Sequence, residues 1–407
     1  MRVAVVGGGI AGMAASHALQ DFAEVTLFEA EPRLGGHTDT HNLLLNGRAH
    51  AVDSGFIVFN RQNYPLFSAW LEQLEVASEP TEMSFSVSLA SGLEYGTSRL
   101  RALFCQRRNA LRPKFLRMLY DIRRFYRAAG SIAERDTRTL AAFLRDGGYS
   151  AAFADHHLLP MCAALWSAPR EGAGTLPIGH VAAFMANHGM TRWQGRPQWR
   201  VVRGGSSSYL RAFAESFSGE ILCRCPVRSV ARDASGVEIE TEGGSERFDY
   251  AVLACHSDAA LALIHATPEE GSALAAIRYQ PNRAVLHSDA SVMPSDPVAW
   301  SSWNVHVAAD GEYEFTYWMN RLQKLGAEPS FFVTLNPARS LKSSWAEREY
   351  RHPVFSSATR AAQLRLRRIN GQRRTLFCGA WSGWGFHEDG FRSGVEAAGQ
   401  LRNLREA

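Results

Sequence analysis

A glycine-rich turn near the N-terminus constrains the fold more than any other feature of the sequence. The apolar segment 2–6 is typical of a buried parallel strand, and an alanine-rich segment that continues to Leu19 is typical of a helix. Residues 7–12 between them read Gly-Gly-Gly-Ile-Ala-Gly, which is the pattern Gly-x-Gly-x-x-Gly. In this pattern the glycines permit a tight turn, let the backbone approach a pyrophosphate and let the helix pack closely on the strand. The sequence predicts that a dinucleotide binds at Gly7, Gly9, Ile10, Ala11 and Gly12.

A carboxylate follows at the position that such a site needs. Residues 24–28 are expected to form a second strand, and Glu29 stands at its carboxyl end, 17 positions after Gly12. A carboxylate there accepts hydrogen bonds from ribose hydroxyls and disfavours a 2′-phosphate. We therefore expect Glu29 to bind the ribose, and we do not expect NADP on this loop.

The residues after Glu29 indicate which dinucleotide binds. Segment 30–38 reads Ala-Glu-Pro-Arg-Leu-Gly-Gly-His-Thr and resembles the Arg-x-Gly-Gly-Arg segment of the flavin amine oxidase and phytoene desaturase superfamily. Similar resemblances are found in segments 203–206, 226–230, 250–255, 375–380 and 390–394. The resemblance implies FAD as the cofactor. It also implies non-covalent binding, because segment 381–386 lacks the cysteine that holds flavin covalently in some amine oxidases.

The same resemblance implies a set of cofactor contacts. Arg33 and the backbone of Gly35 and Gly36 would follow the diphosphate and ribityl chain, with His37 near the flavin edge in place of the family's second arginine. A helix opening at Gly390 would point its N-terminus at the flavin, where its dipole stabilises the reduced form. The remaining implied cofactor-binding residues are Ala30, Thr38, Val227, Gly379 and Phe391.

Superfamily members interleave two domains along the chain, and 407 residues with 46% apolar content suffice for both. The expected fold class is α/β, with a Rossmann-like two-dinucleotide-binding FAD domain interleaved with an α+β substrate domain. Segments 1–60, 200–258 and 370–407 are expected to form the FAD domain. Segments 61–199 and 259–369 are expected to form the substrate domain.

A basic amphipathic segment stands out inside the expected substrate domain. Residues 99–127 contain ten arginines or lysines and one acid, Asp121, whereas the whole chain has a formal charge of +4. One helical face gathers Phe115, Met118, Leu119, Ile122 and Tyr126. Two interpretations remain open: a solvated helix packed on its own core, or an interfacial helix that contacts anionic lipid headgroups. Nucleic acid is not expected, because no aromatic residues interleave the basic ones as a stacking platform.

A narrower resemblance suggests the substrate. Segments 160–167, 187–189, 286–289 and 300–304 look like a group of bacterial flavoproteins commonly encoded beside methyltransferases similar to cyclopropane fatty acid synthase. One branch resembles methyl-fatty-acid desaturases of furan fatty acid synthesis. The resemblance implies desaturation of an unsaturated or methylated fatty acyl chain of a membrane phospholipid. The shortage of charged residues in these motifs and the lack of a second Gly-x-Gly-x-x-Gly for NAD(P)H agree with it.

Three other functions remain open. A fatty acid double-bond isomerase would use the flavin as a transient hydride acceptor, and an amine oxidase would release hydrogen peroxide with simple amines. A redox sensor or methyltransferase scaffold would hold a flavin that no lipid reduces. The acyl chain, the electron acceptor and the oligomeric state are left undetermined.

Desaturation requires a base beside the flavin, and two histidines are the candidates. His37 is one, and His387 is the other, with Glu388 and Asp389 expected to raise its pKa. The expected pocket-lining residues are Trp303, Asn304, Tyr317 and Trp384. No metal site is expected, because His156 and His157 lack a third ligand at a recognisable spacing.

The termini and cysteines predict a compartment. The glycine loop follows Met1 too closely for a cleaved leader, and charge interrupts every apolar run before the roughly 20 residues of a membrane span. Six scattered cysteines suggest free thiols in a reducing environment. We expect a cytoplasmic protein, with peripheral contact at the inner face of the membrane as the alternative that segment 99–127 raises.

Overall fold

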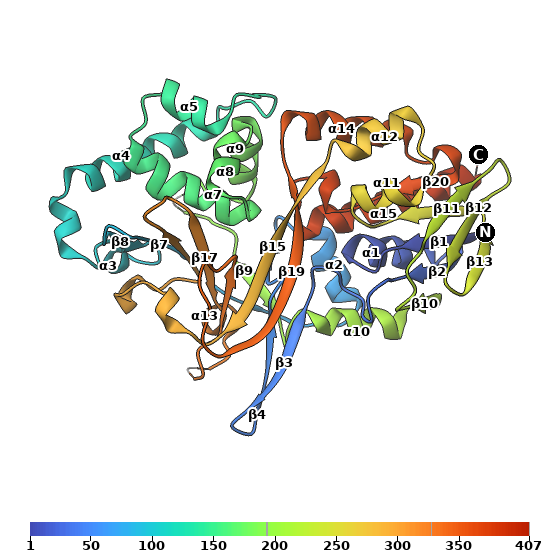
Figure 1. Ribbon diagram of the computed structural model, residues 1–407, viewed down its shortest axis with the longest axis horizontal. Helices are drawn as coiled ribbons and strands as arrows, with labels where there is room; N and C mark the ends of the chain where they lie inside the picture. Colours follow the sequence, from blue (N-terminus) through green and yellow to red (C-terminus); the bar gives the residue numbers. More distant parts are fainter. Residues whose placement is uncertain (193, 327, 407) are drawn as a thin grey trace.

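The computed structural model describes residues 1–192, 194–326 and 328–406, and its elements form two packed halves (Figure 1). One half is built on a parallel sheet with the order β10-β2-β1-β14-β20. Val6 at the end of β1 pairs with Phe28 of β2 and Leu253 of β14, so the carboxyl ends of these strands meet at one edge. The bounds are β1 Arg2–Val6, β2 Glu24–Phe28, β10 Glu220–Leu222, β14 Tyr250–Leu253 and β20 Thr375–Phe377.

Helices cover one face of this sheet and a second layer covers the other. Val3 and Val5 of β1 point into a core shared with helices α1, α2, α10 and α15, whereas Ala4 and Val6 point into a core shared with β11, β12, α11, α12 and α14. Both faces of the strand are therefore buried, as its apolar run predicts. The bounds are α1 Ile10–Leu19, α2 Pro65–Gln73, α10 Ser207–Ser216, α15 His387–Glu406, β11 Ser229–Arg232, β12 Val237–Thr241, β13 Gly244–Phe248, α11 Ser257–Leu263, α12 Pro268–Ala275 and α14 Ser357–Ile369.

The second half is built on a mixed sheet with the order β19-β15-β18-β17-β16-β7-β8. Its two longest strands, β15 and β19, run along the middle of the molecule between the halves (Figure 1). Helices α4 to α9 pack on this sheet through a large apolar core. The strand bounds are β7 Phe85–Leu89, β8 Glu94–Gly96, β15 Arg278–His287, β16 Trp303–Val307, β17 Tyr313–Trp318, β18 Phe332–Leu335 and β19 Ser344–Val354.

The helical layer of the second half includes the basic segment. Phe115, Met118 and Ile122 are buried on the inner face of α4, as predicted, and Leu119 and Tyr126 are half-buried. The bounds are α3 Leu100–Leu103, the 3-10 turn η1 Arg107–Leu111, α4 Pro113–Ala129, α5 Leu140–Asp146, α6 Ala151–Phe153, α7 Leu159–Trp166, α8 Arg170–Thr175, α9 Ile178–Asn187 and α13 Met319–Gln323.

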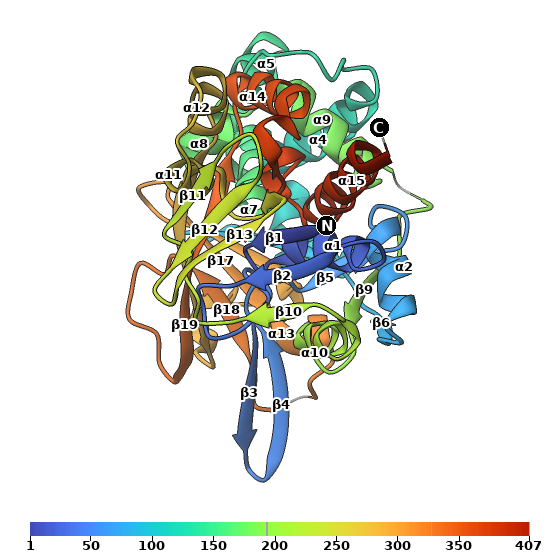
Figure 2. The ribbon, with the colours of Figure 1, turned by 90° about the vertical axis from the view of Figure 1, so that its right-hand side faces the viewer.

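Two small sheets complete the fold. The hairpin β3 (Thr40–Leu45) and β4 (Arg48–Asp53) projects from the body of the molecule (Figure 2). Strand β9 (Trp199–Val202) lies between β5 (Val58–Asn60) and β6 (Ser78–Pro80).

Packing assigns more of the chain to the nucleotide half than the expected ranges did. Helices α2, α12 and α14, and helix α11 from residue 259 on, lie in segments expected to belong to the substrate domain, yet they pack on the parallel sheet. All six cysteines are free. Among the helices that the structure describes, none combines the length and apolar character that a membrane crossing needs.

Candidate functional site

The glycine turn lies between β1 and α1, as the sequence predicts. A Cβ on Gly7 would lie 2.9 Å from the Ala254 carbonyl oxygen, and one on Gly12 would lie 1.8 Å from the Gly7 carbonyl oxygen. A Cβ on Gly9, in contrast, would meet no atom within 4 Å. Gly9 is also the N-cap of α1 and provides no side-chain acceptor for the first-turn N–H groups, which include those of Ile10 and Ala11. The turn thus offers free N–H donors and open space, which fits a diphosphate.

Glu29 is buried at the carboxyl end of β2. Its Oε2 accepts from the Gly8 N–H at 2.7 Å, and its Oε1 accepts from the Glu31 N–H at 2.8 Å. Each carboxylate oxygen can accept a second hydrogen bond, which leaves capacity for ribose hydroxyls. The Cys225 N–H donates to the Glu29 carbonyl oxygen at 2.9 Å, which brings the segment leading to Val227 beside the same strand end.

The Gly35–Gly36 turn lies directly against the glycine turn. The Gly35 N–H donates to the Gly8 carbonyl oxygen at 2.8 Å, and a Cβ on Gly36 would lie 3.3 Å from the Cα of Gly9. Arg33 folds back on this segment: its guanidinium donates to the Thr38 carbonyl oxygen at 2.7 Å and pairs with Asp39 at 3.2 Å. Arg33 therefore shapes the turn, and Gly35 and Gly36 lie beside Gly8 and Gly9 of the glycine turn.

His37 belongs to a cluster of aromatic side chains at the junction of the two halves. Its ring stacks on Tyr350 with centroids 5.2 Å apart and lies 5.6 Å from His256 and 5.3 Å from His352. Burial lowers the pKa of His37, while Arg33 adds to the lowering and a hydrogen bond with the Arg351 carbonyl opposes it. Because that carbonyl can only accept, Nε2 of His37 carries the proton, and Nδ1 keeps the lone pair of a base.

His387, the second predicted base, is enclosed by other rings. Phe56 stacks on it with centroids 3.7 Å apart, and Phe67 meets it edge-on at 5.0 Å. Its Nε2 lies 2.9 Å from the hydroxyl of Tyr209, which also hydrogen-bonds the buried Thr38. Thr38 and His387, far apart in sequence, thus lie at the two ends of one hydrogen-bonded chain.

The expected effect of Glu388 and Asp389 on His387 was wrong. Burial lowers the pKa of His387 to about 3, and neither acid counters it. The Glu388 carboxylate instead accepts from the Leu66 and Phe67 N–H groups at 3.1 and 3.0 Å and so caps α2. Asp389 accepts from the Phe386 N–H at 3.0 Å. Both acids therefore accept hydrogen bonds from backbone N–H groups.

The C-terminal helix α15 begins earlier than Gly390, where it was expected to open. Helix α15 starts at His387, so Gly390 and Phe391 lie within its first turns. The Phe391 ring packs 5.1 Å from Trp70 in the core, which leaves its backbone as the part able to contact a cofactor. A Cβ on Gly390 would lie 2.8 Å from the Ile10 side chain, and the Gly379 N–H donates to Ser393 at 2.9 Å. These contacts bring α15 close to the glycine turn.

One buried acid at this junction was missed from the sequence. Asp53 is fully buried and accepts from Thr40, from the N–H and hydroxyl of Ser206, and from Gln323 Nε2 at 2.8 Å. Burial raises the pKa of Asp53 to about 7 against these hydrogen bonds. Thr40 lies in the same hairpin as Asp53, whereas Ser206, the N-cap of α10, and Gln323 of α13 lie far from it in sequence. Asp53 thus connects the two halves through its hydrogen bonds with Ser206 and Gln323.

The predicted pocket residues do not all have the same role. Trp303 and Tyr317 face each other across β16 and β17, with ring centroids 5.5 Å apart. Asn304 does not have the pocket-lining role that was expected. Its Oδ1 accepts from Ser86 and Ser301, and its Nδ2 donates to the carbonyls of Ser301 and Thr316. Because its amide is saturated and buried, Asn304 stabilises the sheet and has no donor left for a ligand.

Trp384 lies in a cluster of aromatic rings contributed by segment 381–386 and by helices α7 and α9. Phe386 stacks on Phe184 with centroids 4.6 Å apart, and Trp166 lies 5.1 Å from Phe184. Trp384 lies 6.1 Å from Phe184 and accepts a hydrogen bond from the Trp166 indole N–H at its carbonyl. Burial lowers the pKa of the neighbouring His188 to about 4, so this histidine is uncharged at neutral pH.

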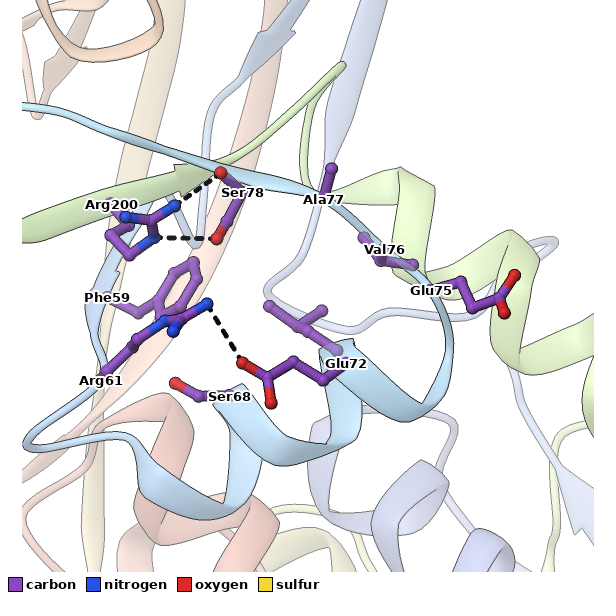
Figure 3. A pocket seen from close by; sticks show the side chains of 10 residues that line it. Phe59, Arg61, Ser68, Glu72, Glu75, Val76, Ala77, Ser78 and Arg200 are labelled. Atoms are coloured by element: carbon purple, nitrogen blue, oxygen red, sulfur yellow. Dashed lines mark hydrogen bonds and ion pairs between the residues drawn. The ribbon is translucent and has the colours of Figure 1, made fainter.

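A surface pocket lies elsewhere, between α2 and the small sheet of β5, β9 and β6 (Figure 3). Arg61 pairs with Glu72 at 3.0 Å, and Arg200 donates to the carbonyl and hydroxyl oxygens of Ser78. None of the predicted site residues lines this pocket.

Comparison with known proteins identifies the family. The family model described as flavin containing amine oxidoreductase matches residues 10–287. A curated relative, the carotenoid phi-ring synthase of Streptomyces griseus, is 30% identical over 291 residues, which cover 66% of this chain and 55% of that protein. The chain thus matches about half the length of this curated relative.

Solved structures share the fold over the full chain. Cyclohexylamine oxidase from Brevibacterium oxydans IH-35A aligns with a TM-score of 0.73 and 17% identity, covering 100% of this chain and 99% of that one. A CLA-producing fatty acid isomerase from P. acnes aligns with a TM-score of 0.68 and 13% identity, covering 98% of each chain. These structures confirm the expected amine oxidase-like α/β fold. The family match supports FAD as the cofactor. The chain belongs to the flavin-containing amine oxidoreductase family.

Proposed function

We propose that this oxidoreductase desaturates an unsaturated or methylated fatty acyl chain of a membrane phospholipid. The observation that carries the proposal is the aromatic cluster of Trp166, Phe184, Trp384 and Phe386. Such rings favour an apolar guest by excluding water. Over the part of the chain that the structure describes, no arginine or lysine is stacked on these four rings.

The chemistry divides between the cofactor and the chain. Bound FAD supplies an acceptor for a hydride. One carbon of the acyl chain gives up that hydride, its neighbour releases a proton to a histidine, and the electron pair left behind forms the double bond. His37 suits the base because its Nδ1 has a free lone pair, and His387 is the second candidate. Dioxygen or another two-electron carrier would serve as the final electron acceptor.

Two alternatives use the same scaffold. An isomerase would return the hydride to another carbon, and the fatty acid isomerase from P. acnes shares this fold. An amine oxidase would oxidise a carbon bound to nitrogen, and cyclohexylamine oxidase shares the fold too. Fold alone does not choose between these reactions. The apolar rings of the cluster support an acyl chain as the guest.

Mass analysis of the lipid after one anaerobic turnover tests the proposal. The holoprotein is mixed with detergent-solubilised phospholipid that carries methylated or unsaturated chains. We expect an acyl product two mass units lighter, in an amount equal to the flavin. An unchanged mass with a moved double bond would replace desaturation with isomerisation. Unaltered lipid together with peroxide release from simple amines in air would replace both with amine oxidation.

A further inference from the structure

Apolar side chains are exposed together at one end of the substrate half. Nine large hydrophobic side chains are exposed among the described residues, and four of them lie in segment 99–127. These four are Leu100 at 77%, Leu111 at 85%, Leu116 at 45% and Tyr120 at 59% exposure. Exposed leucines cost solvation free energy, so their concentration in one segment indicates a surface that is covered by something apolar.

The same segment carries most of its positive charge without acidic partners. Its one acid, Asp121, is buried and held by Arg117 and Arg124 at 3.1 and 3.2 Å. Within the described ranges, no salt bridge holds the other eight basic residues. These are Arg99, Arg101, Arg107, Arg108, Arg112, Lys114, Arg123 and Arg127. The exposed leucines are thus surrounded by uncompensated positive charge.

Helix α4 presents two opposite faces. Phe115, Met118, Ile122 and Phe125 face the core, as their burial shows. Leu116, Tyr120, Arg123 and Arg127 follow the i, i+4, i+7, i+11 spacing of a second stripe, which lies about half a turn away on the outer side. A helix that only packs on its own core has no need for leucine and tyrosine on that side.

The outer stripe ends at a hollow suited to an anion. Arg123, Tyr126, Arg127 and Thr191 line this hollow. Two guanidinium groups one helical turn apart fit the phosphate of a lipid headgroup. Figure 1 shows α3 and α4 at the end of the molecule away from the nucleotide sheet, so a flat partner can reach them without contacting that sheet.

We propose that α3, η1 and the outer stripe of α4 dock on an anionic lipid bilayer. Leu100, Leu111, Leu116 and Tyr120 enter the boundary between headgroups and acyl chains, and the surrounding arginines bind anionic headgroups. Charge complementarity and exposed leucines together select this occupant, since a nucleic acid would use the arginines but not the leucines. The purpose of this docking rests on the proposed function, because the bilayer would supply the phospholipid whose acyl chain is desaturated.

Vesicle co-sedimentation of the FAD-loaded protein tests this docking. The vesicles contain phosphatidylcholine alone or with one third phosphatidylglycerol. We expect binding to the anionic vesicles that weakens with salt, and an about tenfold loss for each of Leu100→Ser and Leu111→Ser. Leu44→Ser is the matched control, because Leu44 is 75% exposed on the hairpin, outside the proposed surface. The flavin spectrum and the melting temperature confirm that each variant is folded.

Several outcomes would overturn the docking surface. These are no binding to either vesicle, equal losses for Leu44→Ser and Leu100→Ser, or binding that the leucine variants leave intact while DNA competes for it. The last result would assign a polyanion site instead. Vesicle binding is measured without turnover, so it can fail while detergent-solubilised lipid is still desaturated. Conversely, an intact docking surface with unreacted lipid would contradict the proposed reaction alone.

Discussion

At the scale of single residues, the site depends on where side chains are missing as much as on where they are present. Gly7 and Gly12 have no room for a Cβ because backbone atoms lie against them, whereas Gly9 faces open space. The first two glycines therefore serve the fold, and Gly9 serves the ligand. This distinction makes the three positions of one motif separable by experiment.

Substituting Gly9 tests that distinction. In Gly9→Ala the new Cβ meets no protein atom and the backbone already has an ordinary φ of −74°, so we expect an unchanged melting temperature for the apoprotein. The methyl group would stand where the diphosphate approaches, so FAD affinity is expected to fall at least tenfold, about 1.4 kcal/mol. Flavin fluorescence titration measures it. Normal affinity would show that the diphosphate does not pass Gly9.

Asp53 offers a second test at this scale. The carboxylate accepts from Thr40, from the N–H and hydroxyl of Ser206, and from Gln323, and in Asp53→Asn one accepting oxygen becomes an NH2 group that cannot accept any of these hydrogen bonds. We expect a loss of about 1–3 kcal/mol in the free energy of unfolding, measured in urea. Asp310→Asn, at an exposed turn where the carboxylate accepts from the Glu312 N–H, should change it by less than about 0.5 kcal/mol. Equal effects would contradict the structural role of Asp53.

At the scale of elements, two helices carry the cofactor turn. Helix α15 packs on α1 so closely that a Cβ on Gly394 would lie 2.1 Å from the Ala11 carbonyl oxygen. Because α1 begins at the glycine turn, this contact helps to fix the position of the turn. The packing of α15 therefore reaches the cofactor indirectly.

A pair of glycines in α15 tests this packing. Gly394→Ala would force the two helices apart, and we expect it to destabilise the protein by about 1–3 kcal/mol and to weaken FAD binding. Gly399→Ala in the same helix meets no atom, so we expect stability to remain equal or to rise by up to about 1 kcal/mol. Thermal unfolding compares them. The opposite order would show that α15 does not press on α1.

The elements also show how far the sequence could predict the structure. The first strand, the turn, helix α1 and Glu29 were predictable because their signals are local. The start of α15 was not, because Gly390 resembles a helix start while the helix begins at His387. Asp53 and Asn304 carried no local signal, since the Ser206 and Gln323 partners of Asp53 lie 153 and 270 positions away. Only the fold reveals which polar side chains are already saturated.

At the scale of the whole molecule, burial of histidines couples stability to pH. Burial lowers the pKa of seven histidines to about 4 or 3: His157, His180, His188, His256, His287, His352 and His387. Their stabilising contribution is complete above the unfolded pKa near 6.5 and is lost as the pH falls below it. Burial raises the pKa of Asp53 to about 7 and of Asp389 to about 6, so these two act in the opposite direction.

Burial also raises the pKa of Glu388, and the seven histidines outnumber these three acids, so the net effect has a definite sign. We expect the melting temperature of the holoprotein, followed by circular dichroism, to fall by about 5 °C or more between pH 7.5 and pH 5.5. Each histidine contributes at most about 1.4 kcal/mol per pH unit. A melting temperature that stays constant or rises over this range would show that these histidines are not held neutral.

The anaerobic absorption spectrum of the yellow holoprotein tests the central claim most directly. It is recorded before and after adding phospholipid with methylated or unsaturated chains, and separately with simple amines. We predict that the oxidised flavin band bleaches with the lipid in proportion to the lipid added and stays unchanged with the amines. Bleaching by amines with no response to lipid would contradict the account and make this protein an amine oxidase.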